Sequence, residues 1–225
     1  MNKKLFVLVA ALSVLLSVVG FAYAAEPGGA VVSNYADLGE YTPQAAGTVS
    51  VEAGNTYRAD LDANQSTYRW VGVTGNATGT IILSDSANNV LYNWSAQGLL
   101  VYASTASTLT WSSLADATAA DMPAYLTSGS DQYANTFTGT SENIGSQLYP
   151  TISSDFANTY DNTGAQAWKT YSLTDGTNLV WAGLVNAGGA NNFRGNPVNY
   201  QMILPEDGTA GDTTAVNYYM WLELQ

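Results

Sequence analysis

Carboxylates are the side chains of this chain best suited to acid–base or metal chemistry, because it contains 18 Asp and Glu residues but no His and no Cys. Without His or Cys there is no Ser-His-Asp triad, no thiol nucleophile and no His-based zinc site. Two carboxylates suffice for glycoside hydrolysis, yet no spacing singles out one pair among the 18. We therefore expect a protein that is not an enzyme.

One acidic loop has the composition of a Ca²⁺ site. It contains Glu206, Asp207 and Asp212, and Ca²⁺ prefers several oxygen ligands from a flexible loop. The spacing matches no EF-hand loop, so an ordinary acidic turn is the simpler interpretation. Ca²⁺ is the one candidate cofactor, and Asp60 with Asp62 is a weaker second site for it.

Three N-glycosylation sequons lie close together: Asn64-Gln65-Ser66, Asn76-Ala77-Thr78 and Asn93-Trp94-Ser95. Asn64 and Asn76 fall in predicted turns. Asn93 alternates with Tyr92 and Trp94, which places it on the opposite, solvent-facing side of a predicted strand. In a host that glycosylates secreted proteins, these three residues are the expected acceptors, and the chain would be a glycoprotein.

Residues 1–24 have the pattern of a secretory signal peptide. Lys3 and Lys4 precede the apolar stretch 5–19, and Ala22-Tyr23-Ala24 is a small-x-small cleavage signal. Two alternatives remain open: an uncleaved anchor, since about 20 apolar residues can span a bilayer, and a pilin-type leader cut before the apolar stretch. With the signal peptide removed, we expect no membrane span and a location outside the cell or at its surface.

The remaining chain is acidic and lacks disulfides. Two of the six basic residues lie in the leader, so four remain against 18 acidic residues, a formal charge of −14. This charge excludes binding to nucleic acid or to anionic lipid through bulk electrostatics. Because a chain without Cys cannot form disulfides, core packing, bound ions or assembly must stabilise it.

Short strand-like runs separated by turn residues recur from residue 48 onward, at the spacing of a sandwich or barrel. The predicted strands are 55–61, 67–73, 79–84, 89–94, 99–104, 108–111, 133–137, 167–173, 179–185, 199–204 and 214–224. The segments 84–91 and 174–181 each place Asp and Asn in a turn between apolar strands, which predicts two similar hairpins. A short helix is expected within 112–126, with Ser113 as a cap.

These patterns predict an all-β fold, an antiparallel β-sandwich of the immunoglobulin-like or jelly-roll-like type. Residues 1–24 are the signal peptide, 25–47 an extended N-terminal arm, and 48–225 the sandwich domain. The last strand has the clearest period of two, with Val216, Tyr218, Met220, Leu222 and Leu224 on one face. Its other face carries Tyr219 and Trp221, the aromatic residues that we expect to be most exposed.

Exposed aromatic rings favour an alternative function. The six Trp residues are distributed over many of the predicted strands, and rings of this kind stack on the faces of sugars. Aromatic residues are also enriched in strands and in cores, which explains most of them without a ligand. A carbohydrate-binding or adhesive module that recognises extracellular polysaccharide is thus the second interpretation.

The chain resembles secreted β-rich filament, sheath and surface-layer subunits of archaea, some of which assemble by donating an N-terminal strand. The resemblance is carried by Ala22-Tyr23-Ala24, the arm 26–46, the three sequons and the strands rich in Thr, Asn and Tyr. It implies a noncatalytic subunit that polymerises with copies of itself into an extracellular filament or pilus, sheath or surface layer. It also implies that Ala30, Val31 and Val32 complete the sheet of the next subunit.

Overall fold

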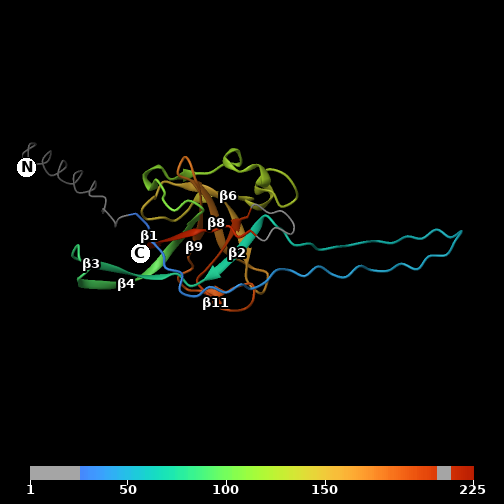
Figure 1. Ribbon diagram of the computed structural model, residues 1–225, viewed down its shortest axis with the longest axis horizontal. Coiled ribbons are helices and arrows are strands. Elements are labelled where there is room, and N and C mark those ends of the chain that lie inside the picture. Colours follow the sequence, from blue (N-terminus) through green and yellow to red (C-terminus); the bar gives the residue numbers. More distant parts are fainter. Residues whose placement is uncertain (1–25, 207–213) are drawn as a thin grey trace, which may run out of the picture.

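The computed structural model describes residues 26–206 and 214–225 (Figure 1). Most of its strands belong to one antiparallel sheet: β1 Gly28–Gly29, β3 Thr78–Ser84, β4 Val90–Ser104, β5 Ala115–Asp116, β6 Gly139–Asn143, β7 Ser153–Tyr160, β8 Gln166–Thr174, β9 Leu179–Leu184 and β13 Tyr219–Leu224. The order is β1-β13-β4-β9-β8-β7-β6, and β3 and β5 pair with β4 and β8 respectively. The all-β, antiparallel prediction is confirmed.

A second, smaller sheet packs on one face of the large one. It consists of β2 Trp70–Gly75 and β12 Tyr200–Pro205, which pair antiparallel, and the hairpin of β10 Ala190–Asn191 and β11 Pro197–Val198 lies just before β12 in the sequence. Val101 and Trp181 of the large sheet pack against Met202 and Leu204 of β12 in one apolar cluster. Two sheets joined by a shared core form a sandwich.

The other face of the large sheet is buried as well. Leu100, Tyr102 and Val180 point to this side, since they alternate with residues of the first cluster, and they pack with Trp111 and Ile144 from the segment 105–152. Because both faces of the sheet are buried, β9 and the inner half of β4 are nearly continuous apolar runs. The period-two signal is consequently weak there.

The segment 105–152 differs from the prediction. In place of one helix within 112–126 there are three single 3-10 turns, Trp111–Ser113, Ala119–Asp121 and Ala124–Leu126. Thr118, and not Ser113, provides the side-chain cap, through a reciprocal pair of contacts with Asp121. Met122, the residue before Pro123, is extended, which ends the turn Ala119–Asp121.

Three further local predictions were wrong. The predicted strand 133–137 is the short helix α2 Tyr133–Thr136, and 108–111 is no strand. The predicted strands 89–94 and 99–104 are a single strand, β4, of 15 residues. Gly98 separates the two runs in the sequence, but the strand continues through it. A Cβ at this position would lie 2.9 Å from the Ala77 carbonyl oxygen, which explains the glycine. β6 and β7 were not predicted, and they lie between the predicted strands 133–137 and 167–173.

The two predicted hairpin turns are present, and in both an Asp carboxylate binds the backbone of the residues that follow it. The Asp85 carboxylate accepts hydrogen bonds from the backbone N–H of Ala87 and Asn89, at 2.9 and 2.8 Å. Asp175 accepts from the backbone N–H of Thr177 and Asn178, at 3.0 and 2.7 Å. An Asp side chain that binds the backbone just after it is a common turn former.

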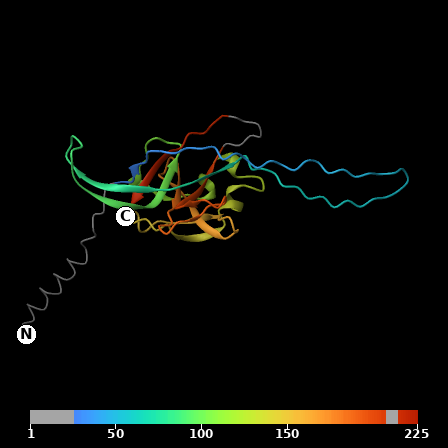
Figure 2. The ribbon, with the colours of Figure 1, turned by 90° about the horizontal axis from the view of Figure 1, so that it is seen from below.

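Residues 30–69 contain no helix or strand. The predicted strand 55–61 is therefore unpaired, and the extended part of the chain reaches Arg69, beyond the predicted end of the arm at residue 47. Figures 1 and 2 show this segment leaving the body as a long narrow loop and returning to β2. Within the described ranges, no helix is long and apolar enough to cross a membrane.

Candidate functional site

Two elements project from opposite ends of the molecule. One is the projecting hairpin, residues 78–97, formed by β3 and the first half of β4. The other is the extended loop, residues 31–69. Both views place them at the two ends of the long axis, with the sandwich between them (Figures 1 and 2). The two elements of one chain therefore cannot touch each other.

The projecting hairpin has one apolar face. In the β3–β4 register Ile81 pairs with Trp94 and Leu83 with Tyr92, and paired residues two apart lie on the same face. The exposed fractions of these four side chains run from 37% to 58%. The Tyr92 and Trp94 rings lie 4.8 Å apart, centroid to centroid. A contiguous exposed surface of this type marks a binding site more often than a scattered apolar residue does.

The opposite face of the hairpin carries a sequon and mixes polar with apolar residues, since Ile82 and Leu91 are 54% and 79% exposed on it. Ile82 pairs with Asn93 and Thr80 with Ser95 on this side. Asn93 is exposed, as are Asn64 in the extended loop and Asn76 between β2 and β3. All three sequons are accessible for modification, and glycosylation stays a prediction. A glycan on Asn93 would leave the apolar face uncovered.

The hairpin is held firmly at its root. Gln97 and Gln225 exchange two backbone hydrogen bonds, at 3.0 and 3.2 Å. The side chain of Leu224 lies over Gly79, where a Cβ would come within 2.6 Å of it. Since β4 continues unbroken into the core, as far as Ser104, the hairpin is an outward extension of the central sheet.

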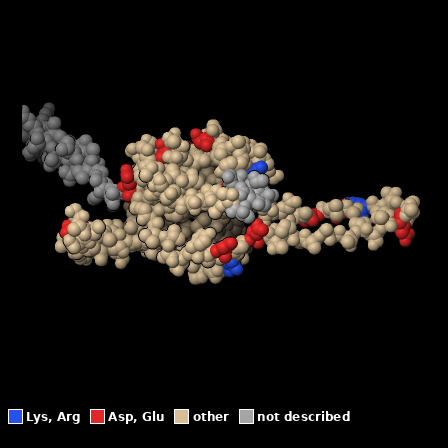
Figure 3. Space-filling model, viewed as in Figure 1, with Lys and Arg blue, Asp and Glu red and all other residues tan. Residues whose placement is uncertain are grey.

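The projecting hairpin is almost uncharged in an acidic protein. Asp85, at its turn, is the one charged residue of the segment 78–97 (Figure 3). Hydrogen bonds from the Asn89 side chain and backbone and from the Ala87 backbone lower the pKa of Asp85. That carboxylate is already bonded within the turn, so the rest of the hairpin surface consists of uncharged side chains.

The extended loop begins at the edge of the large sheet. Gly28 and Gly29 pair with Leu222 and Trp221 of β13, and the Ala30 N–H donates to the Met220 carbonyl at 2.9 Å. Of the predicted assembly residues, Ala30 is thus paired within its own chain. Val31 and Val32 follow it and are 92% and 63% exposed, because the chain leaves the sheet there.

The outer part of the extended loop has a strand pattern without a partner strand. Val49 and Val51 alternate with polar residues on one side of the tip, and Tyr57 and Leu61 do so on the other. Their side chains are between 46% and 89% exposed. A turn closed by Gly54, at φ 83°, joins the two halves. Such alternation is typical of a strand with one buried face.

Arg58 and Asp60 show which side of the loop is polar. Their side chains form an exposed ion pair at 3.1 Å, so these residues, two apart, lie on the same side of the extended backbone. Tyr57 and Leu61 alternate with them and face the other way. The Tyr57 hydroxyl accepts a hydrogen bond from the Glu52 N–H at 2.9 Å, across the turn.

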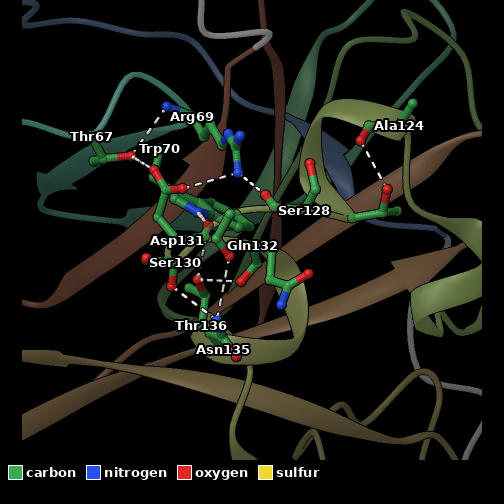
Figure 4. Close-up of polar contacts among 12 residues, drawn as sticks. Thr67, Arg69, Trp70, Ala124, Ser128, Ser130, Asp131, Gln132, Asn135 and Thr136 are labelled. Carbon is green, nitrogen blue, oxygen red and sulfur yellow. Dashed lines mark hydrogen bonds and ion pairs between the residues drawn. The ribbon is translucent and has the colours of Figure 1, made fainter.

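Asp131 fixes the point where the extended loop returns to the body (Figure 4). Its carboxylate accepts from the Thr67 hydroxyl at 2.6 Å and from the Arg69 guanidinium at 3.0 Å. Its main-chain carbonyl accepts from the Trp70 indole at 2.6 Å. Arg69 also donates to the Ser128 carbonyl. These contacts anchor the returning end of the loop to residues 128–131.

The aromatic residues predicted to be exposed on the last strand have different environments. Tyr219 is 48% exposed. Trp221 is half-buried and packs edge to face on Trp111, with ring centroids 5.6 Å apart. The expectation for Trp221 needs correction, because the face of β13 that it shares lies against the second core cluster.

A buried carboxylate on the same strand escaped the sequence analysis. Glu223 is 2% exposed and accepts hydrogen bonds from Tyr102, Ser146 and the backbone N–H of Gln147 and Leu148. The donors Ser146, Gln147 and Leu148 hold the segment 144–149 against the sheet, and Tyr102 donates from the neighbouring strand β4. The sequence signal that could have indicated this buried carboxylate is a single Glu within an alternating strand of mostly apolar residues. We assign Glu223 a structural role.

Glu206 lies at the end of β12, where its N–H donates to the Arg69 carbonyl at 2.8 Å. The other two residues of the predicted Ca²⁺ loop, Asp207 and Asp212, lie outside the described residues. Within the described ranges, no group of three or more acidic side chains is arranged to hold a metal ion. Ca²⁺ binding remains a prediction.

A comparison of the chain with protein-family models, with curated proteins and with solved structures finds no match. The fold and the site together define an all-β sandwich with two apolar projections at opposite ends.

Proposed function

We propose that this protein is a noncatalytic extracellular subunit that assembles with copies of itself into a filament, sheath or layer at the cell surface. The observation that carries the proposal is the pair of exposed apolar projections at opposite ends of one molecule. Surfaces of this type are usually covered by a partner. A contact between two different surfaces of the same chain is head-to-tail, and it builds an open-ended assembly unless the rotation between copies closes a ring; surfaces at opposite ends favour the open form.

The sequence supports the extracellular and noncatalytic parts of this proposal. The leader pattern 1–24 predicts export, and the absence of His and Cys removes the commonest catalytic groups. An assembly held by apolar contact also suits a strongly acidic chain, because identical copies repel each other electrostatically and need a contact without charge. The projecting hairpin meets that need, since Asp85 at its turn is its one charged residue.

The test is to purify residues 25–225 from the native host and to examine them by negative-stain electron microscopy and size-exclusion chromatography at rising concentration. We expect filaments, tubes or sheets. A variant in which residues 44–63 are replaced by a short Gly-Ser turn keeps the Ser66–Tyr41 and Asp131 contacts and should remain monomeric. Uniform monomers of the full-length mature chain at every concentration would exclude the proposal.

The alternative is a carbohydrate-binding module, and one observation favours it. Tyr92 and Trp94 present adjacent exposed rings on one face of the hairpin, an arrangement on which a sugar ring can stack. If this is the function, soluble polysaccharide should quench Trp fluorescence of the monomer, and the substitution Trp94→Ala should abolish the effect. The loop-shortened variant should then bind as well as the unchanged chain.

A further inference from the structure

We infer that a cavity between the two sheets, lined by β2, β7 and β12, binds a neutral sugar ring. The cavity has a volume of about 340 Å³ and is lined by residues 72–74, 158–160, 193 and 201–203, and cavities of this size serve as small-molecule sites. These residues belong neither to the projecting hairpin nor to the extended loop. The site is therefore independent of the proposed function and distinct from the Tyr92 and Trp94 rings.

The first support is a buried hydroxyl without a hydrogen-bond partner. Thr159 of β7 is 9% exposed and lines the cavity, and its Oγ1 atom makes no hydrogen bond to the described part of the chain. Its side chain lies on the same face of β7 as Ala157, which packs in the first core cluster. Thr170 pairs with Ala157 and lies on this face as well, but its hydroxyl accepts from the Ile203 N–H of β12 at 3.1 Å. The sheets are thus in direct contact at Thr170, whereas Thr159 lines the cavity.

The second support is a pair of aromatic residues at the opening of the cavity. Tyr160 and Phe193 both line the cavity and are 51% and 53% exposed. Gln201 is 5% exposed and holds the backbones of both residues. Its Nε2 donates to the Tyr160 carbonyl at 3.0 Å, and its Oε1 accepts from the Phe193 N–H at 3.3 Å. The opening is therefore already formed by contacts within the chain, as is usual for ligand sites.

The chemistry of the lining determines the class of ligand. Every lining residue is uncharged, so a charged ligand would lose its hydration without gaining a charged partner. Met202 and Ile203 supply apolar surface, and the Tyr160 and Phe193 rings supply flat faces. The Thr159 hydroxyl can both donate and accept a hydrogen bond. A neutral sugar matches this set, because its C–H faces pack on aromatic rings and its hydroxyl groups both donate and accept.

Saturation-transfer-difference NMR on residues 25–225 tests the class of ligand. The probes are the methyl glycosides of glucose, mannose and galactose, with glucuronic acid as the charged counterpart and cyclohexanol as an apolar alcohol. We expect transfer to the ring C–H protons of at least one methyl glycoside and weaker or no transfer to glucuronic acid. Transfer to none of the methyl glycosides, or equally strong transfer to glucuronic acid, would overturn the inference. Transfer to cyclohexanol alone would show a cavity that selects only for apolar character, which also contradicts it.

Substitutions at Thr159 test the hydroxyl. Thr159→Val keeps the shape of the side chain and should weaken sugar binding about tenfold. It should leave the midpoint of thermal unfolding unchanged or higher, because the lost hydroxyl has no partner in the fold. Thr159→Ser keeps a hydroxyl and should restore binding. Thr170→Val removes a bonded hydroxyl and should lower the midpoint. An equal decrease in Thr159→Val would show that the Thr159 hydroxyl stabilises the fold, which contradicts the inference.

A further pair of variants locates the sugar. Phe193→Ala should weaken binding, whereas Trp94→Ala on the projecting hairpin should leave it unchanged, with near-UV circular dichroism showing that both variants fold. If Trp94→Ala loses binding while Phe193→Ala and Thr159→Val retain it, the sugar lies on the projecting hairpin and the inference is wrong. The state of assembly does not affect this comparison, so a failure here leaves the proposed function standing.

Discussion

The Glu223 carboxylate of β13 lies 2.7 Å from the Tyr102 hydroxyl of β4, and both side chains are almost completely buried. Burial first, and then the negative charge of Glu223, raise the pKa of Tyr102 far above its ordinary value. The phenol therefore stays protonated and donates to the carboxylate. The contact joins two neighbouring strands with a loop, since Ser146 donates to the same oxygen at 2.8 Å.

Replacing Glu223 by Gln should destabilise the protein by about 3 kcal/mol, because the new amide N–H₂ would face donors that now have a buried acceptor. The free energy of unfolding in urea is the measurement. The exposed substitution Glu52→Gln is the control and should change it by less than about 0.5 kcal/mol. Equal changes in the free energy of unfolding for the two substitutions would show that the buried network stabilises the fold no more than an exposed carboxylate does.

Asp131→Asn should loosen the base of the extended loop with a small effect on global stability, about 1 kcal/mol. The main-chain carbonyl that binds Trp70 is retained, but the acceptors for Thr67 and Arg69 are altered. Trypsin should then cleave after Arg69 several-fold faster, as judged by mass spectrometry of the fragments. Asp60→Asn, which removes only an exposed ion pair, should leave this rate unchanged.

Asp175 should make stability depend on acid pH. Burial opposes its ionisation, but hydrogen bonds from the backbone N–H of Thr110 and Asn178 and from the Asn178 side chain outweigh this and lower the pKa of Asp175 from 3.8 to about 2. A folded-state pKa below the unfolded value adds stability that is complete above about pH 4 and lost as the pH falls through about 2.

The corresponding variant is Asp175→Asn, and a shift of this size corresponds to about 2 kcal/mol. At pH 7 the variant should be less stable than the natural chain by this amount in urea unfolding. The difference should shrink when the same experiment is repeated at pH 2.5. A difference that stays constant between pH 7 and 2.5 would contradict the assignment to ionisation.

Trp221→Ala should act on stability and not on ligand binding. The ring packs on Trp111 in the second core cluster, and its removal should cost about 2 kcal/mol, less than for a fully buried Trp. The exposed neighbour Tyr219 supplies the control, since Tyr219→Ala should cost less than about 1 kcal/mol. Loss of polysaccharide binding in Tyr219→Ala at unchanged stability would instead favour the carbohydrate-binding alternative.

The class of the fold could be predicted from the sequence because its signals are local. Period-two alternation and turn residues depend on neighbours along the chain, and they located β3, β8, β9 and β12 to within a few residues. The turns at Asp85 and Asp175 were predicted for the same reason, since one side chain and the backbone just after it make the turn. Asn93 is exposed as predicted, but so are Tyr92 and Trp94 on the other face, because the hairpin projects from the body.

What lies against each face depended on residues far apart in the sequence. Alternation groups Trp221 with Glu223, but it does not show that Trp111 and Ser146 cover them. Nor does it distinguish a strand packed in its own chain from one left in solvent, as at 55–61. Alternation reports which residues share a face, whereas burial is set by long-range contacts. Only the tertiary structure placed the two apolar projections at opposite ends.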